Sequence, residues 1–448
     1  MNTTPYNYQR EDAIQIQAWD GRALLANEPG TGKSLTAFLW AWKHIKAAWP
    51  ILVVCPAGLK WNWAREAQMH FNWRSAILET NIARLPMLTG QEVVIINYDV
   101  LDSWWRVLRR KYKPKLVILD ECHLIKSLVA KRTLATHNLC KRTPHVIALS
   151  GTPITNRPAE LWSTLHILQP KLWPNFYKYA HRYCQPRKFR GHWQFKGAAH
   201  LPQLHRKLCE HVMIRRRKKD VLKDLPPKAR YVVPLETSKP KLYEQALKGF
   251  RKFLATHDPH SSENHARTLA GIGHLKRLAA RLKLPGVYAW VDNFLEETDV
   301  KLILFAIHKK IIAKLKKRYG KLAVVVDGSV TGRKRQQFYD SFTKNKSIRI
   351  LIGNITAAGV GWNGVAASTV AFAEMAWTPG EHVQAEGRIE RIGAKRRLTS
   401  YYLVAKGTIE EDICRLIQKK QLVLEQTLDG VAMGDLSVYD DLIKQLAA

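Results

Sequence analysis

Two sets of short apolar runs dominate this sequence, and each run precedes or follows a segment of helical periodicity. Such alternation is typical of parallel βα units, because a strand covered on both faces is apolar throughout and its crossover connection is a helix. The sequence therefore predicts an α/β fold with two separate doubly wound parallel sheets. The expected strands occupy residues 23–26, 51–54, 93–96, 116–119 and 146–149 in the first set, and 302–305, 322–326, 348–352, 369–373 and 401–404 in the second.

The region between the two sets indicates how the chain divides. From about residue 171 to 301, strand signals fade and the pattern becomes basic and mostly helical, with a connector expected at Leu225-Pro226-Pro227. A chain of 448 residues suits two or three domains. We expect, in chain order, a first lobe (1–225) with a helical insertion (about 170–225), a second lobe (226–448) with a helical insertion (about 236–298), and tail helices at 413–428 and 436–446.

The charge of the chain indicates a polyanionic partner. Lys and Arg number 72 against 37 Asp and Glu, which gives a formal net charge of +35. Nucleic acid is favoured over an anionic membrane surface, because the basic residues are spread over segments that look folded and form no basic amphipathic tail. The alternative is a basic surface without a specific ligand. No run of about 18 apolar residues predicts a membrane span, and the N-terminus lacks the pattern of a secretory signal.

The cysteines argue against a metal or disulfide framework. No two of them have Cys-x-x-Cys spacing, so neither a zinc site nor a set of disulfides is expected, and a reducing compartment fits best. The six residues are Cys55, Cys122, Cys140, Cys184, Cys209 and Cys414.

The strongest local signal is Asn27-Glu28-Pro29-Gly30-Thr31-Gly32-Lys33-Ser34, which follows an expected strand and opens an expected helix. Gly30 and Gly32 would let backbone N–H groups curl around phosphate oxygens. In such a loop Lys33 would reach the β- and γ-phosphates of ATP, and the Ser34 hydroxyl would bind Mg²⁺. A P-loop normally begins with glycine where Asn27 stands. The alternative is a glycine turn ahead of a helix.

A second signal lies at the end of the expected strand 116–119, where Asp120 and Glu121 follow directly. Ligands of open α/β sheets bind at this carboxyl edge. Asp120 would hold Mg²⁺, and Glu121 would polarise the attacking water. An adjacent acidic pair at a strand end is commonly no more than a surface feature, but here it follows Lys33 in the same expected sheet.

Two further motifs complete the pattern. Ser150-Gly151-Thr152-Pro153 directly follows an expected strand, where the hydroxyls of Ser150 and Thr152 can couple the nucleotide state to a nucleic-acid track. In the second set, Arg388 and Arg391 within 384–393 are three residues apart and share one face of a helix. Two cations suit the charge that builds on a transferring phosphoryl group. The alternative for the first motif is an ordinary turn, and the alternative for the two arginines is an exposed basic helix face.

In their order and spacing these four elements resemble the motifs of superfamily 2 helicases, and in detail those of the Swi/Snf-type ATPases. The resemblance covers roughly residues 5–425, and Phe372-Ala373-Glu374 with Tyr402 to Thr408 are similar to the annealing-helicase branch. It extends to the basic junction Arg215 to Lys219 and to the second-lobe segments 327–329, 355–361 and 377–380.

The resemblance implies two RecA-like lobes with ATP and Mg²⁺ in the cleft between them. It implies an adenine contact for Gln9 in Tyr8-Gln9-Arg10, and a catalytic role for Gln384 beside the two arginines. It also implies nucleic-acid or coupling contacts for Pro56, Ser150, Thr152, Gly328, Thr356, Gly359, Gly361 and Trp377.

The chain departs from the family pattern at a few positions. Cys122 stands where Ala or Gly is usual, Gly387 and Glu390 replace an Asp and a His, and Trp362 is unusual beside Gly361. Because nearly the whole chain is motor, we expect a compact bacterial or viral member acting as a monomer in the cytoplasm, or in the nucleus of a eukaryote.

The predicted function is a DNA-dependent ATPase that moves on duplex or forked DNA. One alternative is a strand-separating DNA or RNA helicase, since duplex translocation rests on the resemblance alone. Another is a non-motor nucleic-acid binder with a vestigial ATP site. The presence of Lys33, Asp120, Glu121 and both arginines argues against the last.

Overall fold

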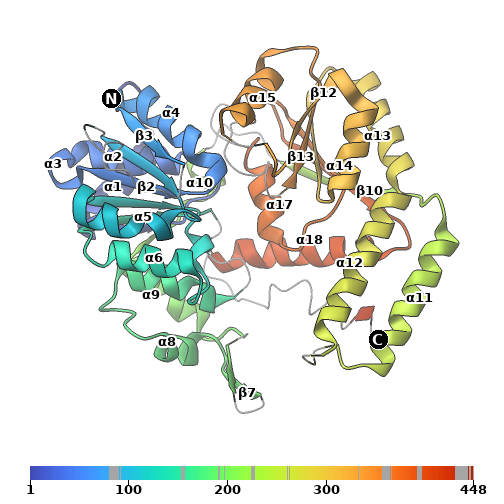
Figure 1. Cartoon of the computed structure of the whole chain (residues 1–448), viewed down its shortest axis with the longest axis horizontal. Coiled ribbons are helices and arrows are strands. Elements are labelled where there is room, and N and C mark those ends of the chain that lie inside the picture. The colour runs from blue at the N-terminus through green and yellow to red at the C-terminus, as the bar shows by residue number, and fades with distance from the viewer. Residues whose placement is uncertain are drawn as a thin grey trace.

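The computed structural model contains two parallel β-sheets, each inside its own lobe, and the two lobes lie side by side (Figure 1). It describes the chain except residues 80–89, 91, 152, 154–156, 190–191, 196, 223–227, 260, 262, 331, 356–363, 365, 391–395, 429–441, 443–444 and 447–448. The predicted fold class, two α/β lobes with parallel sheets, is therefore confirmed. No described helix combines the length and hydropathy that a membrane crossing requires.

The first sheet has the strand order β3-β4-β2-β5-β6-β1-β9, and every pairing in it is parallel. Its interior strands are buried on both faces, as in β2, where Ile51 and Val53 pack into one cluster and Leu52 and Val54 into the other. The strands are β1 (Arg22–Leu25), β2 (Ile51–Cys55), β3 (Ser75–Leu78), β4 (Val93–Asn97), β5 (Leu116–Asp120), β6 (His145–Leu149) and β9 (Met213–Ile214).

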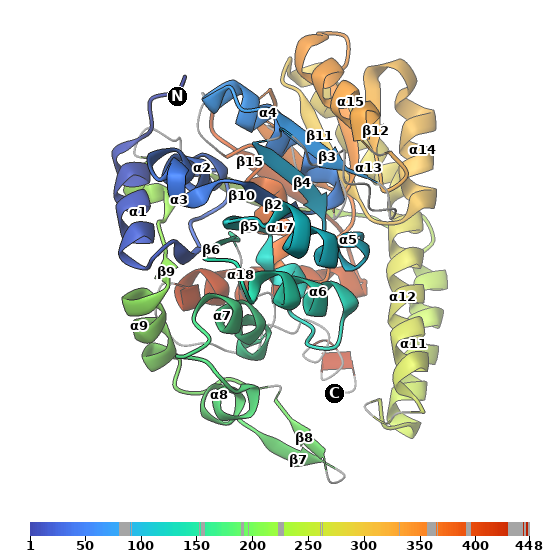
Figure 2. The same ribbon diagram turned by 60° about the vertical axis from the view of Figure 1, so that its left-hand side comes forward.

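Helices cover both faces of this sheet (Figure 2). One face carries helices α1 (Asn7–Ala18), α2 (Lys33–Lys43), α3 (Ile45–Ala48) and α4 (Lys60–Phe71). The other carries α5 (Leu101–Val107), α6 (Lys131–Cys140), α7 (Trp162–Leu168), α8 (Phe176–Tyr183) and α9 (Leu201–His211). The antiparallel hairpin β7 (Arg187–Phe189) and β8 (His192–Gln194) follows α8, and α10 (Lys218–Val221) follows β9.

The second sheet has the order β10-β15-β14-β11-β13-β12 and is also parallel throughout. Its strands are β10 (Ala229–Leu235), β11 (Leu302–Ala306), β12 (Ala323–Val326), β13 (Ile350–Asn354), β14 (Thr369–Phe372) and β15 (Thr399–Ala405). Its helices are α11 (Pro240–Thr256), α12 (His265–Leu282), α13 (Leu284–Glu297), α14 (Lys309–Tyr319), α15 (Gly332–Lys344), α17 (Pro379–Glu386) and α18 (Ile409–Leu428).

All ten strands expected from apolar runs are present within a few residues of their predicted bounds. The tail helix expected at 413–428 is α18, and the one expected at 436–446 lies mostly outside the described residues. The lobe boundary near 226 also falls outside them and stays a prediction, although β10, which begins at Ala229, belongs to the second sheet.

The region from 171 to 301 is mostly helical, as expected, but it also contains the strands β7, β8, β9 and β10, which the sequence did not predict. None of these strands is a run of four or more apolar residues. The strand β10 forms one edge of its sheet, contains Pro234 and has five residues that are at least partly exposed, which an edge strand tolerates. The two-residue strand β9 exists only through its pairing with Leu24 and Leu25 of β1.

Candidate ATP site between the lobes

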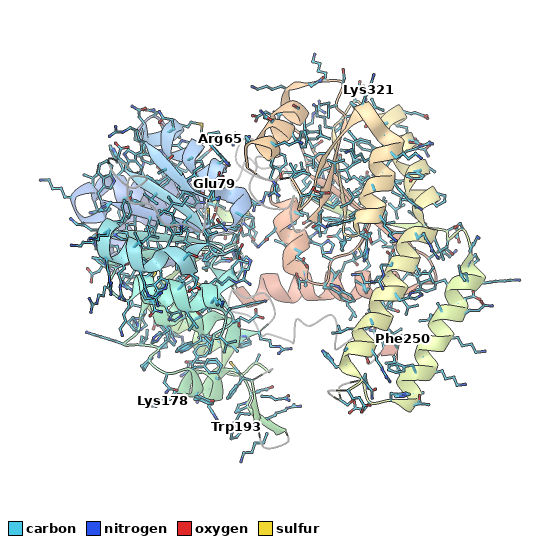
Figure 3. The ribbon with its side chains drawn as sticks, in the orientation of Figure 1. Arg65, Glu79, Lys178, Trp193, Phe250 and Lys321 are labelled. Atoms are coloured by element: carbon cyan, nitrogen blue, oxygen red, sulfur yellow. The ribbon has the colours of Figure 1, made fainter. Side chains whose placement is uncertain are left out.

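A cavity of about 540 Å³ lies between the two lobes and collects most of the residues predicted for ATP chemistry. The first lobe lines it with Gln9 of α1, with the loop after β1, and with residues of α4 such as Arg65, which Figure 3 labels on the side facing the second lobe. The second lobe contributes Arg388 and one face of α15. The predicted residues in the wall are Gln9, Pro29, Gly30, Gly32, Lys33, Ser34, Asp120, Glu121 and Arg388.

The glycine-rich loop has the backbone that a phosphate cradle requires. Gly30 has φ of 89° and Gly32 has φ of 76°, in the left-handed region where a Cβ is disfavoured. Gly32 is the N-cap of α2, so the free N–H groups of that helix and its dipole face the cavity. Thr31 is buried and its hydroxyl donates to Glu28 O at 2.9 Å, which holds the loop closed from behind.

Asn27, which replaces the usual first glycine, has a structural role. Its Nδ2 donates to Asp12 Oδ2 at 2.7 Å, and its Oδ1 accepts from the backbone N of Arg216 at 2.8 Å. The Arg216 side chain also donates to Asp12 Oδ1 at 2.9 Å, so hydrogen bonds join Asn27, Asp12 and Arg216 to one another. The start of the loop is therefore tied to α1 and to the segment after β9.

Lys33 lies deep in the cavity beside the loop. Its Nζ donates to the carbonyl oxygens of Asn27 at 2.8 Å and Glu28 at 3.2 Å. Burial lowers the pKa of Lys33 to about 8, while the charges of Glu121 and Asp120 act in the opposite direction. A phosphate arriving in the cavity would supply the counter-charge that stabilises the ammonium.

Asp120 ends β5 with its carboxylate turned into the cavity wall. Trp63 Nε1 of α4 donates to Asp120 Oδ2 at 2.8 Å, and the backbone N of Glu121 donates to Oδ1 at 3.0 Å. Burial, followed by the charge of Glu121, raises the pKa of Asp120 to about 7. A buried carboxylate of this kind is stabilised when a cation binds.

These groups fit Mg²⁺. Ser34 and Asp120 offer hard oxygen ligands on the same side of the cavity, and Mg²⁺ commonly takes one or two protein oxygens and completes its shell with phosphate and water. Among the described residues no cluster of three or more His, Cys, Asp or Glu side chains could hold a metal by itself. All six cysteines are free thiols.

Glu121 adopts a left-handed backbone, with φ of 49°. This conformation places its carboxylate between the two lobes: Oε1 lies 3.6 Å from Arg388 Nη2, and Oε2 lies 3.4 Å from His123 Nδ1. Within the described part of the chain, the buried Oε2 accepts no hydrogen bond. Such an oxygen is available to a water molecule.

Gln9 is buried at the cavity wall, but its amide is already engaged. Its Oε1 accepts from Tyr6 N at 3.0 Å, and its Nε2 donates to Thr31 O at 3.2 Å, a carbonyl that also accepts from Tyr8 Oη at 2.8 Å. The second N–H of Nε2 could donate a hydrogen bond to a ring nitrogen of adenine. The adenine role of Gln9 stays a prediction.

The second lobe reaches the site through α17 and the turn after it. Arg388 lines the cavity, whereas Gln384, half-buried in α17, is not among the described residues that do so. Arg391 lies outside the described residues. Glu386 anchors the motif, since its buried carboxylate accepts hydrogen bonds from Arg230 of β10 at 2.7 and 2.9 Å.

The two departures from the family pattern in this motif lie where the lobes meet. A Cβ on Gly387 would lie 2.5 Å from Pro29 Cβ, and a Cβ on Gly151 would lie 2.6 Å from Pro29 Cγ, so one glycine from each lobe encloses the loop proline. Glu390 accepts a 2.9 Å hydrogen bond across the interface from Lys218 Nζ. Both residues therefore fit the packing between the lobes.

The residues expected to contact nucleic acid or couple to it are spread widely. Ser150 is buried, with its Oγ 3.2 Å from His123 Nδ1, which links it to the turn after Glu121. Pro56 follows β2, and Gly328 lies exposed in the turn after β12. Lys276 of α12 covers the ring of Trp377, with Nζ 3.7 Å from its centroid. Thr152, Thr356, Gly359 and Gly361 lie outside the described residues.

Sequence reasoning missed several parts of the cavity. Trp63 gave no sign that it would contact Asp120, because 57 residues separate the two and no periodic pattern connects them. Arg215, noted only as part of a basic junction, donates to Ala26 O at 2.6 Å behind the loop. The face of α15 that lines the cavity, with Gln336, Tyr339 and Asp340, has the pattern of an ordinary amphipathic helix.

Comparison with known families identifies two domain types in this chain. Residues 15–284 match the SNF2-related domain, and residues 286–393 match the helicase conserved C-terminal domain. The two matches together include the glycine-rich loop, Asp120, Glu121 and Arg388.

Several curated proteins are similar along nearly the whole chain. A Caenorhabditis elegans protein named as a homolog of the SWI/SNF-related matrix-associated actin-dependent regulator of chromatin subfamily A-like protein 1 is 34% identical over 431 residues, 94% of this chain and 61% of that protein. The mouse DNA annealing helicase and endonuclease ZRANB3 is 30% identical over 453 residues, 96% of this chain and 41% of its own length. The chain thus spans about two fifths to three fifths of these relatives.

Among solved structures, the Sulfolobus solfataricus SWI2/SNF2 ATPase core in complex with dsDNA is similar, with a TM-score of 0.46 and 21% identity. The similarity covers 96% of this chain and 97% of that one.

Proposed function

This chain belongs to the SNF2-related family of helicase-like ATPases, and from that premise we propose that it is a DNA-dependent motor that hydrolyses ATP to translocate on duplex or branched DNA. One observation supports the ATPase part above all. Lys33, Ser34, Asp120 and Glu121 from one lobe and Arg388 from the other surround a single cavity of about 540 Å³.

In the proposed reaction each side chain acts from the position it has in the structure. The N-terminus of α2 and Lys33 bind the phosphates; Ser34 and Asp120 would hold Mg²⁺, which would neutralise phosphate charge when bound. Glu121 orients the attacking water and accepts its proton through Oε2. Arg388 stabilises the charge that develops on the γ-phosphoryl oxygens. Arg391 is predicted to stabilise this charge together with Arg388.

The proposed cycle couples chemistry to movement between the lobes. Because Glu121 and Arg388 lie on opposite sides of the cavity, loss of the γ-phosphate removes a group that both sides bind, and the cleft can open. Both halves of the site belong to one chain, so we propose that a monomer suffices. We propose that it works in the cytoplasm of a bacterium or of a virus-infected cell, or in the nucleus of a eukaryote.

DNA is the proposed track because the chain carries a formal net charge of +35 and because its relatives include a protein named as a DNA annealing helicase. Contacts to the phosphate backbone would make binding steeply dependent on salt. On B-DNA the slope of log K against log salt should be about −0.9 for each phosphate contacted. An affinity that does not change with salt would contradict this.

The decisive experiment compares ATPase rates with single-stranded DNA, blunt duplex, forked DNA and RNA. We expect duplex or forked DNA to stimulate far above single strands or RNA, and Lys33→Ala to abolish turnover and weaken nucleotide binding. Displacement of the third strand from a triplex tests translocation, and a labelled fork tests rewinding or branch migration. Brisk unwinding of tailed duplexes without triplex displacement would identify a strand-separating helicase instead.

A further inference from the structure

One segment of the first lobe is unusually basic. Residues 161–209 contain nine Lys or Arg and no Asp or Glu. The segment runs from α7 through α8 and the β7–β8 hairpin into α9. Its charge therefore has no acidic partner within the segment, and the surface it forms favours a polyanion.

The β7–β8 hairpin places an aromatic ring among these cations. Trp193 of β8 is 44% exposed and lies directly opposite Lys188 of β7, whose Nζ is 5.6 Å from the centre of the indole ring. Arg187 precedes Lys188 on the same strand, and both are exposed. Within the described residues neither cation forms an ion pair with a carboxylate.

The base of the hairpin is held by aromatic packing. Phe195, just after β8, contacts the rings of Phe176, Tyr177 and His181 at centroid distances of 5.5 to 5.9 Å. The ring of His181 also meets Trp193 at 4.8 Å. Trp193 is therefore presented on a supported element, which lowers the conformational entropy lost when a ligand binds.

The hairpin extends away from the body of the first lobe, at the end opposite to α4 (Figures 1 and 2). Figure 3 shows Trp193 at this end, with Lys178 of α8 nearby. The α11–α12 helical hairpin of the second lobe extends toward the same side of the molecule in both views. A nucleic acid that crosses both lobes on this side would meet the hairpin.

We propose that the β7–β8 hairpin binds the unpaired strand where a DNA duplex branches, with Trp193 stacked on an unpaired base and Arg187 and Lys188 against the adjoining phosphates. Arg187 and Lys188 alone could contact the phosphates of any DNA duplex. An exposed indole adds affinity only for a base whose face is free, as in a single strand or at a fork. The inference deepens the proposed function, because it names the DNA structure that the motor recognises.

The test measures equilibrium binding without nucleotide, by fluorescence anisotropy of a labelled fork and of a labelled blunt duplex with the same paired length. Trp193→Ala should weaken fork binding roughly 5- to 150-fold, the range for loss of one base–aromatic stack, and leave duplex binding within about twofold. Trp193→Phe should restore most of the difference. Replacing Arg187 and Lys188 with Ala should reduce the salt slope for the fork by about 0.7 per lost contact.

Trp42→Ala is the matched control, since Trp42 is 42% exposed but lies on α2, away from the hairpin. It should leave the fork-to-duplex ratio of affinities unchanged. An unchanged ratio in Trp193→Ala, or equal losses on fork and duplex, would overturn the proposal. The result is independent of the ATPase assay: a wild-type protein that discriminates forks but shows no DNA-stimulated turnover would refute the motor function and leave the hairpin assignment standing.

Discussion

The hydrogen bond from Trp63 to Asp120 should control both the Mg²⁺ requirement and the pH dependence of ATP hydrolysis. Trp63 is 1% exposed, and its ring packs edge-on against Phe38 at 5.1 Å. Trp63→Phe keeps an aromatic ring in this position and removes the N–H that donates to Asp120 Oδ2 at 2.8 Å. The substitution therefore removes the hydrogen bond, and the smaller ring also removes some buried volume, which a control variant must match.

The magnitude follows from the chemistry of the pair. A hydrogen bond to a charged group contributes about 1.5–3 kcal/mol, and loss of a group that orients a metal ligand typically lowers metal affinity or activity by roughly 10- to 100-fold. The Mg²⁺ concentration for half-maximal turnover should rise by that factor. The Trp63 hydrogen bond lowers the pKa of Asp120 against the effect of burial, so its removal raises that pKa further. The acidic limb of the pH–rate profile should move upward by about one pH unit or more.

The assay is steady-state ATPase activity with saturating DNA, titrated with Mg²⁺ at several pH values. Trp49→Phe is the control, because Trp49 belongs to the same aromatic region and its buried Nε1 has no hydrogen-bond partner among the described residues. Thermal unfolding of both variants reports any loss of packing. If Trp63→Phe is folded and neither the Mg²⁺ requirement nor the acidic limb moves, then Trp63 does not position Asp120.

Further substitutions around the cavity test the other roles. Glu121→Gln should bind Mg·ATP but hydrolyse it on the order of 10²-fold or more slowly in single-turnover measurements, and near-normal turnover would remove Glu121 from the mechanism. Arg388→Ala should cut hydrolysis on the order of 10³-fold while DNA affinity survives; the reverse pattern would make it a backbone contact. Gly387→Ala brings a Cβ to 2.5 Å from the loop proline, so overpacking of about 1–3 kcal/mol should lower kcat roughly 5- to 150-fold if closure of the lobes bears that cost, whereas Gly249→Ala, with nothing within 4 Å of the added Cβ, should have no such effect. Because the pKa of Asp120 is raised to about 7 and its proton must leave when metal binds, Mg·ATP affinity should fall as the pH drops through 7, and calorimetry should find that dependence flattened in Asp120→Asn.

The sequence by itself determined the two parallel sheets and most of the residues that line the cavity between the lobes. Strands such as β2 and β5 are covered on both faces, so burial appears as an unbroken apolar run. The glycine-rich loop could also be predicted from the sequence, because the positive φ of Gly30 and Gly32 favours glycine at these two positions. These features depend on neighbours in the chain.

Only the tertiary structure decided how the site is supported. Asn27 is explained by Asp12 and Arg216, which lie 15 and 189 residues away along the chain. Gly387 is explained by its contact with Pro29 of the other lobe. The two-residue strand β9 forms by pairing with β1, and the base of the β7–β8 hairpin is held by packing of Phe195 on Phe176 of α8. A contact between residues far apart in sequence imposes no local periodicity. For this physical reason no pattern in the sequence predicted these long-range contacts.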